Sequence, residues 1–414
     1  MSKLAALRPV LPILIGASLM LSIGMGLRQS LGIFVQPLTR DIGISIADFT
    51  LAIAVQNLAW GFLQPVAGAL VVRLGFRPVM VFGAAAHAAG LLLLAGAQGQ
   101  VSVVLGAGLL IGLSLACSAI AIALAVGAQV VPAALRSATL GVISAVGSLG
   151  SLLAAPLGQI LAEDHGWRAG ILGFAALAML MLPAAWVAGG ADRVPVREAG
   201  RGEAIPAAAS GGAAAAARIA LGTPAFVVMT AAYFVCGMQL IFLTTHLPSY
   251  LTICGMDPML SAEALGVIGG FNVLGSLFFG WAGGRWNKQA LLGLIYLLRS
   301  LALGAYFAWP PSAASTLVFA AVMGFLWLGV GPLVAGSVAE MFGLRWQAMI
   351  SGIAFMSHQL GSFLGAYGGG LIFDALGSYD LAWRAGVGLG LLAGVVQIGF
   401  ALGRPRGPSL ATAG

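Results

Sequence analysis

The chain consists of long apolar runs separated by short polar connections, and this pattern restricts its fold more than any other feature. Each run reaches about 20 residues or more, the length at which a helix crosses a hydrocarbon core of about 30 Å. The twelve runs cover residues 9–38, 46–73, 77–97, 101–131, 136–164, 166–189, 222–254, 260–283, 288–308, 312–341, 346–376 and 380–403. Because strand-like alternation is absent and open sheet edges cannot be satisfied in lipid, we predict an all-α membrane protein of twelve transmembrane helices.

The basic residues predict how the chain is oriented. If both termini are cytoplasmic, only Arg40, Arg168 and Arg384 fall in connections on the outer side. All other lysines and arginines outside the helices fall on the inner side, as the positive-inside rule requires. We therefore expect a multi-pass protein of a bacterial inner membrane. The formal charge of +7 follows from this topology and requires no nucleic-acid partner.

One long connection rich in Gly, Ala, Pro and Arg, residues 190–221, divides the runs into six and six. We predict a cytoplasmic linker there, between halves at 1–189 and 222–414. The halves repeat each other, because "WRAG" recurs after the fifth and eleventh runs and "GALVVRLGFR" in the second run corresponds to "GWAGGRWNK" in the eighth. Each half has an even number of spans, so the two copies keep one orientation and form a pseudo-two-fold pair.

Twelve spans, a long central loop and the "RLGFR" loop after the second helix resemble the major facilitator superfamily. Within it, "RQSLGIF" (28–34) and "RLGFRPVMVFG" (73–83) are similar to the monocarboxylate and oxalate/formate transporter branch. Two positions depart from the pattern. Val72 stands where the superfamily loop usually has aspartate, and the Asp-x-x-x-Arg pair of animal monocarboxylate carriers falls on Asn272 and Ser276.

Arg28, with Gln29 beside it, interrupts the first apolar run. It lies twenty residues after Arg8 and twelve before Arg40, or about 30 Å and about 18 Å along a helix. The acidic residues all lie at predicted helix ends or in connections: Asp41, Asp48, Glu163, Asp164, Asp192, Glu198, Glu203, Asp257, Glu263, Glu340, Asp374 and Asp380. With no carboxylate at mid-membrane, an anionic substrate is the simplest partner for Arg28, whose fork binds a carboxylate at two points. The alternative is an arginine held for structure by carbonyls or water.

Further substrate candidates come from depth and from the repeat. Arg299 in "LIYLLRSLA" is predicted near the midplane, although the family pattern makes its helix peripheral and a structural role equally suitable. Aligning Pro37 with Pro248 places Gln239 opposite Arg28 in the other half. Gln29, next to Arg28, and Asn272 complete the proposed substrate residues. Asn272 could also be a packing contact. We interpret several other polar residues as packing contacts: Gln56, Asn57, Ser144, Ser148 and Gln359.

His246 and His358 are the candidates for carrying a coupled proton, because histidine changes charge near neutral pH. We place His358 first, since the resemblance implies that the eleventh helix can bring a basic group near the central cavity. The alternative for each is a neutral histidine bonded between helices.

We find no phosphate-binding loop, metal-ligand cluster or catalytic triad in the sequence, so we expect no enzyme and no cofactor. The favoured function is secondary transport of a small organic anion, a monocarboxylate, by alternating access and with proton coupling. The expected partners are the carboxylate, protons and the lipid bilayer, with the protein acting as a monomer. The alternatives are an anion exchanger of the oxalate/formate type and an efflux carrier for apolar compounds.

Overall fold

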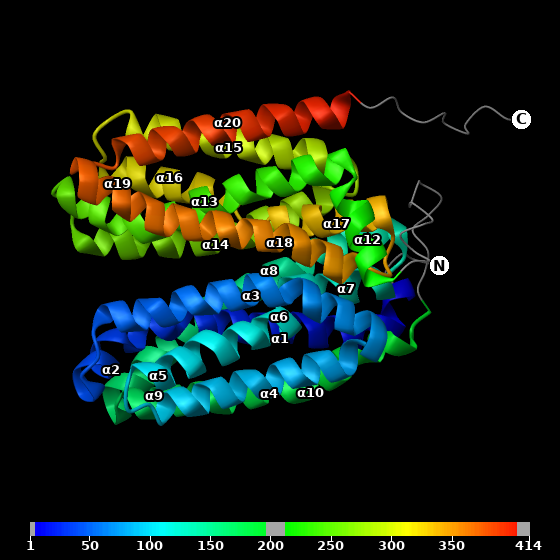
Figure 1. The fold of residues 1–414 in the computed structure, drawn as a ribbon, viewed down its shortest axis with the longest axis horizontal. Coiled ribbons are helices and arrows are strands. Elements are labelled where there is room, and N and C mark those ends of the chain that lie inside the picture. Colours follow the sequence, from blue (N-terminus) through cyan, green and yellow to red (C-terminus); the bar gives the residue numbers. More distant parts are fainter. Residues whose placement is uncertain (1–4, 196–211, 404–414) are drawn as a thin grey trace, which may run out of the picture.

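The computed structural model describes residues 5–195 and 212–403, which form helices and short connections without a strand. Figure 1 shows two bundles, one from each part of the sequence. The first bundle contains η1 (Ala5–Val10), α1 (Leu11–Gln29), η2 (Ser30–Phe34), α2 (Val35–Ile42), α3 (Ile46–Leu74), α4 (Phe76–Ala95), α5 (Gln100–Val103), η3 (Val104–Leu110), α6 (Ile111–Ser118), α7 (Ile120–Val130), α8 (Ala133–His165), α9 (Trp167–Met179), α10 (Met181–Ala188) and η4 (Gly189–Arg193). The second contains α12 (Ala213–Leu221), α13 (Pro224–Ile253), α14 (Pro258–Ala282), α15 (Lys288–Phe307), α16 (Ala313–Phe325), α17 (Val330–Phe342), α18 (Gln347–Phe363), η5 (Leu364–Gly368), α19 (Gly369–Leu376) and α20 (Asp380–Leu402).

Every predicted apolar run is helical in the structure. Eleven helical runs within the described residues are long and apolar enough to cross a membrane, from Leu7–Leu38 to Asp380–Leu402. The remaining predicted run, 346–376, is formed by α18, η5 and α19 in unbroken succession. Its serine, histidine, glutamine and glycine residues make it less apolar than the others. The predicted all-α membrane architecture is therefore confirmed.

Polar residues define where several helices begin. Ser45 Oγ accepts from the Asp48 backbone N–H at 3.1 Å, and Asp48 Oδ2 accepts from the Ser45 N–H at 2.9 Å, so α3 starts with a capping box. Asp192, at the end of η4, accepts from the Phe76 and Arg77 N–H groups at 2.7 and 3.0 Å. These bonds cap α4 and attach the junction at Gly75, which follows Val72 and the end of α3, to the end of the first bundle.

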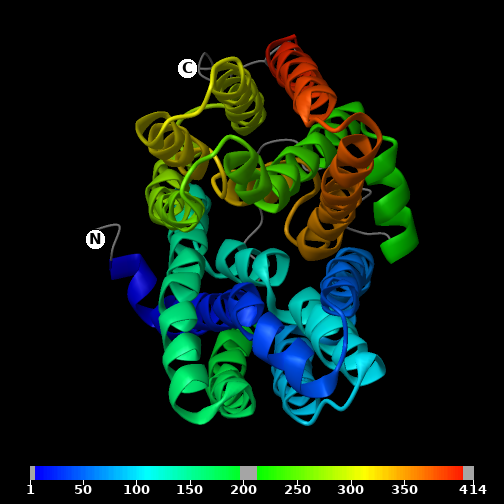
Figure 2. The ribbon, with the colours of Figure 1, turned by 90° about the vertical axis from the view of Figure 1, so that its left-hand side faces the viewer.

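The connection between the bundles contains helical structure at both ends. η4 falls at its start and α12 occupies its last residues. Residues 196–211 of the predicted linker lie outside the described residues. We propose the halves at 1–189 and 222–414 as the units that move, because the helices before and after this connection form two separate bundles (Figure 2).

The two bundles approach each other most closely at the end where η1 begins and α20 finishes (Figure 1). A Cβ on Gly141 of α8 would lie 2.6 Å from the Gly280 Cα of α14. A Cβ on Gly68 of α3 would lie 2.3 Å from the Met349 N of α18. Only glycine permits such backbone approach. The ribbons separate toward the opposite end, so the structure shows the bundles closed at the end that carries the termini.

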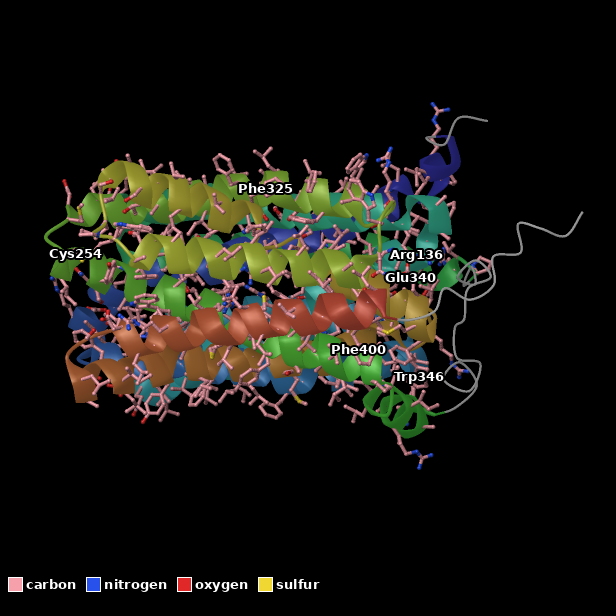
Figure 3. All side chains as sticks on the ribbon, turned by 90° about the horizontal axis from the view of Figure 1, so that it is seen from above. Arg136, Cys254, Phe325, Glu340, Trp346 and Phe400 are labelled. Atoms are coloured by element: carbon pink, nitrogen blue, oxygen red, sulfur yellow. The ribbon has the colours of Figure 1, made fainter. Side chains whose placement is uncertain are left out.

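Charged side chains accompany this closed end. Figure 3 shows Arg136, at the start of α8, and Glu340, near the end of α17, at the same end of the molecule, with Cys254 at the other. Lys288 Nζ donates to Glu340 Oε1 within the second bundle. Glu340 therefore neutralises Lys288 close to the junction of the bundles.

Candidate functional site

Arg28 lies in the last turn of α1, immediately before the chain tightens into the 3-10 segment η2. Its Nε donates to Gln56 Oε1 at 2.9 Å and its Nη2 donates to Asn57 Oδ1 at 2.5 Å. The guanidinium carbon also lies 5.2 Å from the centre of the Trp60 ring, which is within cation–π range. α3 thus supplies all three contacts, and the side chain is half-buried.

The partners of Arg28 carry no negative charge. Amide oxygens satisfy two of its five N–H donors and leave its full positive charge in place. Salt bridges join Arg168 to Asp41, Lys288 to Glu340 and Arg384 to Asp380, and all three lie at the ends of helices. An uncompensated cation at membrane depth attracts an anion strongly, because the low dielectric weakens screening.

The Arg28 site reaches the second bundle through Asn57. Gln359 Nε2 of α18 donates to the Asn57 carbonyl oxygen at 3.1 Å and approaches Asn57 Oδ1 at 3.4 Å. Next to this bond, the Trp60 and Phe355 rings have centroids 4.6 Å apart. The guanidinium is therefore held at a contact between the two bundles.

His358 follows directly on the same helix. Its ring lies over Phe355, with centroids 5.5 Å apart and planes 11° apart, and against Tyr233 of α13 at 4.6 Å. Its Nδ1 lies 3.3 Å from Gln359 Oε1 and 3.4 Å from Ser362 Oγ. The structure thus connects two residues predicted from sequence, Arg28 and His358, through Asn57 and Gln359 in one cluster.

Gln239 lies elsewhere. Its Nε2 donates to Ser300 Oγ of α15 and to the Gly386 carbonyl oxygen of α20, both at 2.9 Å. It also borders an apolar cavity of about 230 Å³ between α13, α19 and α20. Its described bonds run to α15 and α20, whereas those of Arg28 run to α3, so Gln239 is not among the described contacts of the Arg28 cluster.

Arg299 and Asn272 meet the same short segment of backbone. Residues 326–329 interrupt the tenth apolar run between α16 and α17. Arg299 Nη2 donates to the Leu326 carbonyl oxygen at 2.6 Å, and Asn272 Oδ1 accepts from the Leu328 N–H at 2.8 Å. Arg299 is fully buried, and its Nη1 donates to Cys236 Sγ at 3.0 Å. Both residues thus satisfy backbone groups that an unbroken helix would pair internally.

His246 has both ring nitrogens engaged. Nδ1 lies 3.3 Å from Tyr379 Oη, and Nε2 lies 2.9 Å from the Ala366 carbonyl oxygen in the π-helical segment η5. The ring is buried against Phe242, with centroids 5.1 Å apart. These contacts give it the bonds of a histidine that ties helices together. Gln29, in turn, is exposed, and it takes no part in the described hydrogen bonds of Arg28.

The aromatic members of the cluster were not predicted. Trp60 follows Gln56 by four residues, so both face the same side of α3, and this spacing could have indicated it. Tyr233 and Phe355 belong to apolar runs in which nothing distinguishes them from packing residues. Gln56, Asn57 and Gln359 were interpreted as packing contacts, whereas the structure gives all three of them bonds at the Arg28 site.

Comparisons with known proteins agree on one family. The family model described as Major Facilitator Superfamily matches residues 14–366. Monocarboxylate transporter 3 of Mus musculus is 31% identical over 152 residues, which is 37% of this chain and 30% of that protein. Monocarboxylate transporter 13 of Rattus norvegicus is 27% identical over 347 residues, covering 83% of this chain and 77% of that protein.

Solved structures share the fold across almost the whole chain. The fucose:proton symporter FucP of E. coli superposes with a TM-score of 0.70 at 14% identity, covering 94% of this chain and 98% of that one. The human organic anion transporter MFSD10 superposes with a TM-score of 0.66 at 16% identity, covering 95% and 99%. At these identities the likeness shows the architecture alone.

Proposed function

The chain belongs to the Major Facilitator Superfamily, and on this premise we propose that it is a secondary active carrier of a small monocarboxylate that works by alternating access. Members of this family are membrane transporters. Similarity to proteins named monocarboxylate transporters supports the substrate class. We place the protein in a bacterial inner membrane, and the distribution of basic residues supports cytoplasmic termini.

The observation that carries this proposal is the charge state of the Arg28 site. The two amide oxygens hold one edge of the guanidinium, formed by Nε and Nη2. The remaining donors, on Nη1 and Nη2, form a second edge that matches the two oxygens of a carboxylate. A carboxylate bound there would neutralise the cation and find apolar surface on Trp60.

The position of the site supports alternating access. Arg28 and Asn57 belong to the first bundle, whereas Gln359 and His358 belong to the second. With both termini cytoplasmic, closure at the terminal end is an outward-facing state. Rocking of one bundle against the other would then expose the same site to the opposite side.

We propose further that transport is coupled to protons through His358. A monocarboxylate entering against a negative-inside potential meets a cost of about 2.3 kcal/mol per charge per 100 mV. A co-transported proton removes that cost. His358 is suited to this role because it shares a cluster with Arg28, whereas both ring nitrogens of His246 are already bonded.

Uptake into proteoliposomes tests the proposal. Purified protein is supplied with labelled lactate, pyruvate, formate or benzoate, with the external pH set between 8 and 6. We expect uptake of at least one of these acids to rise as the external pH falls. Uptake that ignores pH and requires an anion inside the vesicle would identify an exchanger, and no uptake of any acid would refute the substrate class.

A further inference from the structure

An unbroken series of hydrogen bonds connects the two ends of the candidate site. Arg28 Nη2 donates to Asn57 Oδ1 at 2.5 Å. Gln359 Nε2 donates to the Asn57 backbone carbonyl oxygen at 3.1 Å and lies 3.4 Å from Asn57 Oδ1. His358 Nδ1 lies 3.3 Å from Gln359 Oε1. Two neutral amides, one from each bundle, thus stand between a fixed cation and a titratable ring.

Only one assignment of donors and acceptors is consistent with this series of hydrogen bonds. An arginine can only donate, so Asn57 Oδ1 accepts. Gln359 directs its NH2 group at Asn57, so its Oε1 faces His358 as an acceptor and His358 Nδ1 must carry the hydrogen. Ser362 Oγ donates to the His358 carbonyl oxygen at 2.9 Å, which leaves its lone pairs for the same Nδ1–H. The neutral ring is therefore protonated on Nδ1, and Nε2 is the atom that can accept a transported proton.

The charges around His358 are positive or neutral. α13 contributes Tyr233 and Cys236, α15 contributes Arg299 at electrostatic range, and α3 connects the ring to Arg28 through the amides. A proton on Nε2 adds a further positive charge to this group. A carboxylate on Arg28 offsets that charge, so each of the two ligands makes binding of the other more favourable.

From this geometry we propose that Asn57 and Gln359 are positioning residues that couple carboxylate binding at Arg28 to protonation of His358. The proton moves from solution to Nε2, and no covalent bond other than this N–H is made. The resulting imidazolium strengthens the Nδ1–H bond to Gln359 Oε1, because bonds from a charged donor are stronger. Gln359 then holds Asn57, which orients the guanidinium edge for the carboxylate.

The coupling is restricted to one conformation. Asn57 and Gln359 lie on opposite bundles, so their bond exists only while this contact between the bundles is intact. When the bundles rock apart here, the two ligand sites lose their connection and each releases its ligand independently. This inference rests on the proposed proton-linked carboxylate transport and assigns the coupling to two residues that do not change charge.

The test compares Gln359→Met with the wild-type protein. In detergent, the panel acid that the wild type transports fastest is titrated at pH 8 and pH 6, and proton uptake is followed with an indicator dye. We expect wild-type affinity to increase at least about fivefold between these pH values, a typical coupling strength. In Gln359→Met the change in affinity between pH 8 and pH 6 should fall below about twofold. Exchange of substrate for substrate in proteoliposomes should persist. Gln397→Met, which changes a buried glutamine of α20, should behave as the wild type.

A second variant keeps the test decisive if Gln359→Met does not fold. Gln359→Glu preserves size and shape but gives His358 a permanent counter-charge, so the proton is bound before substrate arrives. Adding substrate should then draw less than about a fifth of the wild-type proton uptake. Proton uptake equal to wild type in either variant would overturn the coupling role of Gln359 and leave the proposed function intact. If the wild type transports no acid of the panel, the proposed function itself fails.

Discussion

Arg28 is held by two amide oxygens instead of a carboxylate, and this difference decides what its charge can do. An internal acid would complete the pair and leave the site neutral. Amides fix the direction of the guanidinium while leaving its charge for a ligand. The sequence predicted that no acid would pair with Arg28, and the Asp and Glu residues that the structure describes lie near helix ends or in connections. The amides that orient the arginine could not be assigned, since their facing depends on the rotation of α3 against α1.

Replacing Arg28 with lysine tests whether geometry matters as well as charge. Lysine presents a point charge and cannot make two parallel bonds to a carboxylate. We expect Arg28→Lys to bind the transported acid about tenfold to a hundredfold more weakly, the loss of one charge-assisted bond of about 1.5–3 kcal/mol. Calorimetric titration of purified protein measures this change. Arg384→Lys, at an exposed helix start, is the matched control, and equal affinity in the two variants would argue against two-point binding.

The case of Gln239 shows how far a repeat can predict a site. Aligned prolines place Gln239 at the depth of Arg28, but they do not specify the direction of the side chain. In the structure Gln239 passes close to α20 at Gly390, where an added Cβ would lie 2.1 Å from Gln239 Nε2. The sequence of the first half did not indicate that a glycine would leave this space. The repeat does not specify this direction, which depends on one glycine of a neighbouring helix.

At the scale of the helix, the fourth and tenth apolar runs are both interrupted. Side chains of neighbouring helices bond the backbone groups at these interruptions. In the first bundle, Gln56 and Gln64 of α3 donate to the Ala107 and Ala116 carbonyl oxygens at 2.6 and 2.8 Å, where η3 and the bend before α7 release them. In the second bundle, residues 326–329 receive the corresponding bonds from α14 and α15. Hydropathy predicts the length of such helices but not their breaks, because the breaks depend on polar partners from other helices.

Arg299 provides a test of this reading. We expect Arg299→Met to destabilise the protein by about 1–3 kcal/mol, because the buried Leu326 carbonyl oxygen loses its partner. The affinity for the transported acid should change by less than about threefold, since the described bonds of Arg299 satisfy backbone and Cys236. Thermal unfolding and calorimetric titration measure the two effects, with the exposed Arg285→Met as control. A tenfold loss of affinity at unchanged stability would restore Arg299 to the substrate site.

The glycine contact between α8 and α14 makes a prediction about the closed end. An alanine at Gly141 would place its Cβ 2.6 Å from the Gly280 Cα, so the backbones must separate. Overpacking of this kind costs about 1–3 kcal/mol, which should raise the population open at the terminal end by at least about fivefold.

A cysteine introduced by Ser276→Cys reports on this opening, because Ser276 is fully buried in the closed contact. In a Cys254→Ser background, an impermeant maleimide should label it faster in Gly141→Ala than in the parent. Gly266→Ala, whose added Cβ meets no neighbour within 4 Å, is the control. Equal labelling rates in all three proteins would show that this contact does not govern closure.

At the scale of the molecule, the architecture was predictable because the bilayer permits few solutions. Each span needs about 20 apolar residues and internal backbone bonding, so run lengths specify the number of helices. The predicted run 46–73 is observed as Asp48–Leu74, and 380–403 as Asp380–Leu402. Which end is closed was not predictable, since one sequence has to support both states of a carrier.

His358 gives the whole-molecule prediction. If the proton travels on His358, the His358→Gln variant should lose the rise in uptake between external pH 8 and pH 6, because no proton is then bound with the anion. Exchange of substrate for substrate should continue at a rate within about threefold of wild type, since the exchange of two anions moves no net charge across the membrane. Proteoliposome uptake and counterflow measure both. A wild-type pH dependence in His358→Gln would return this histidine to a structural role.

The binding of an anionic substrate at Arg28 is tested most directly by whether Arg28 distinguishes an anion from a neutral molecule of the same shape. Calorimetric titration compares the transported acid with its primary amide in wild type and in Arg28→Ala. We predict that the wild type prefers the acid by at least about a hundredfold, roughly the worth of two charge-assisted bonds. In Arg28→Ala this preference should fall below about threefold, with the thermal midpoint maintained. An Arg28→Ala protein that still prefers the acid as strongly as the wild type would contradict the account.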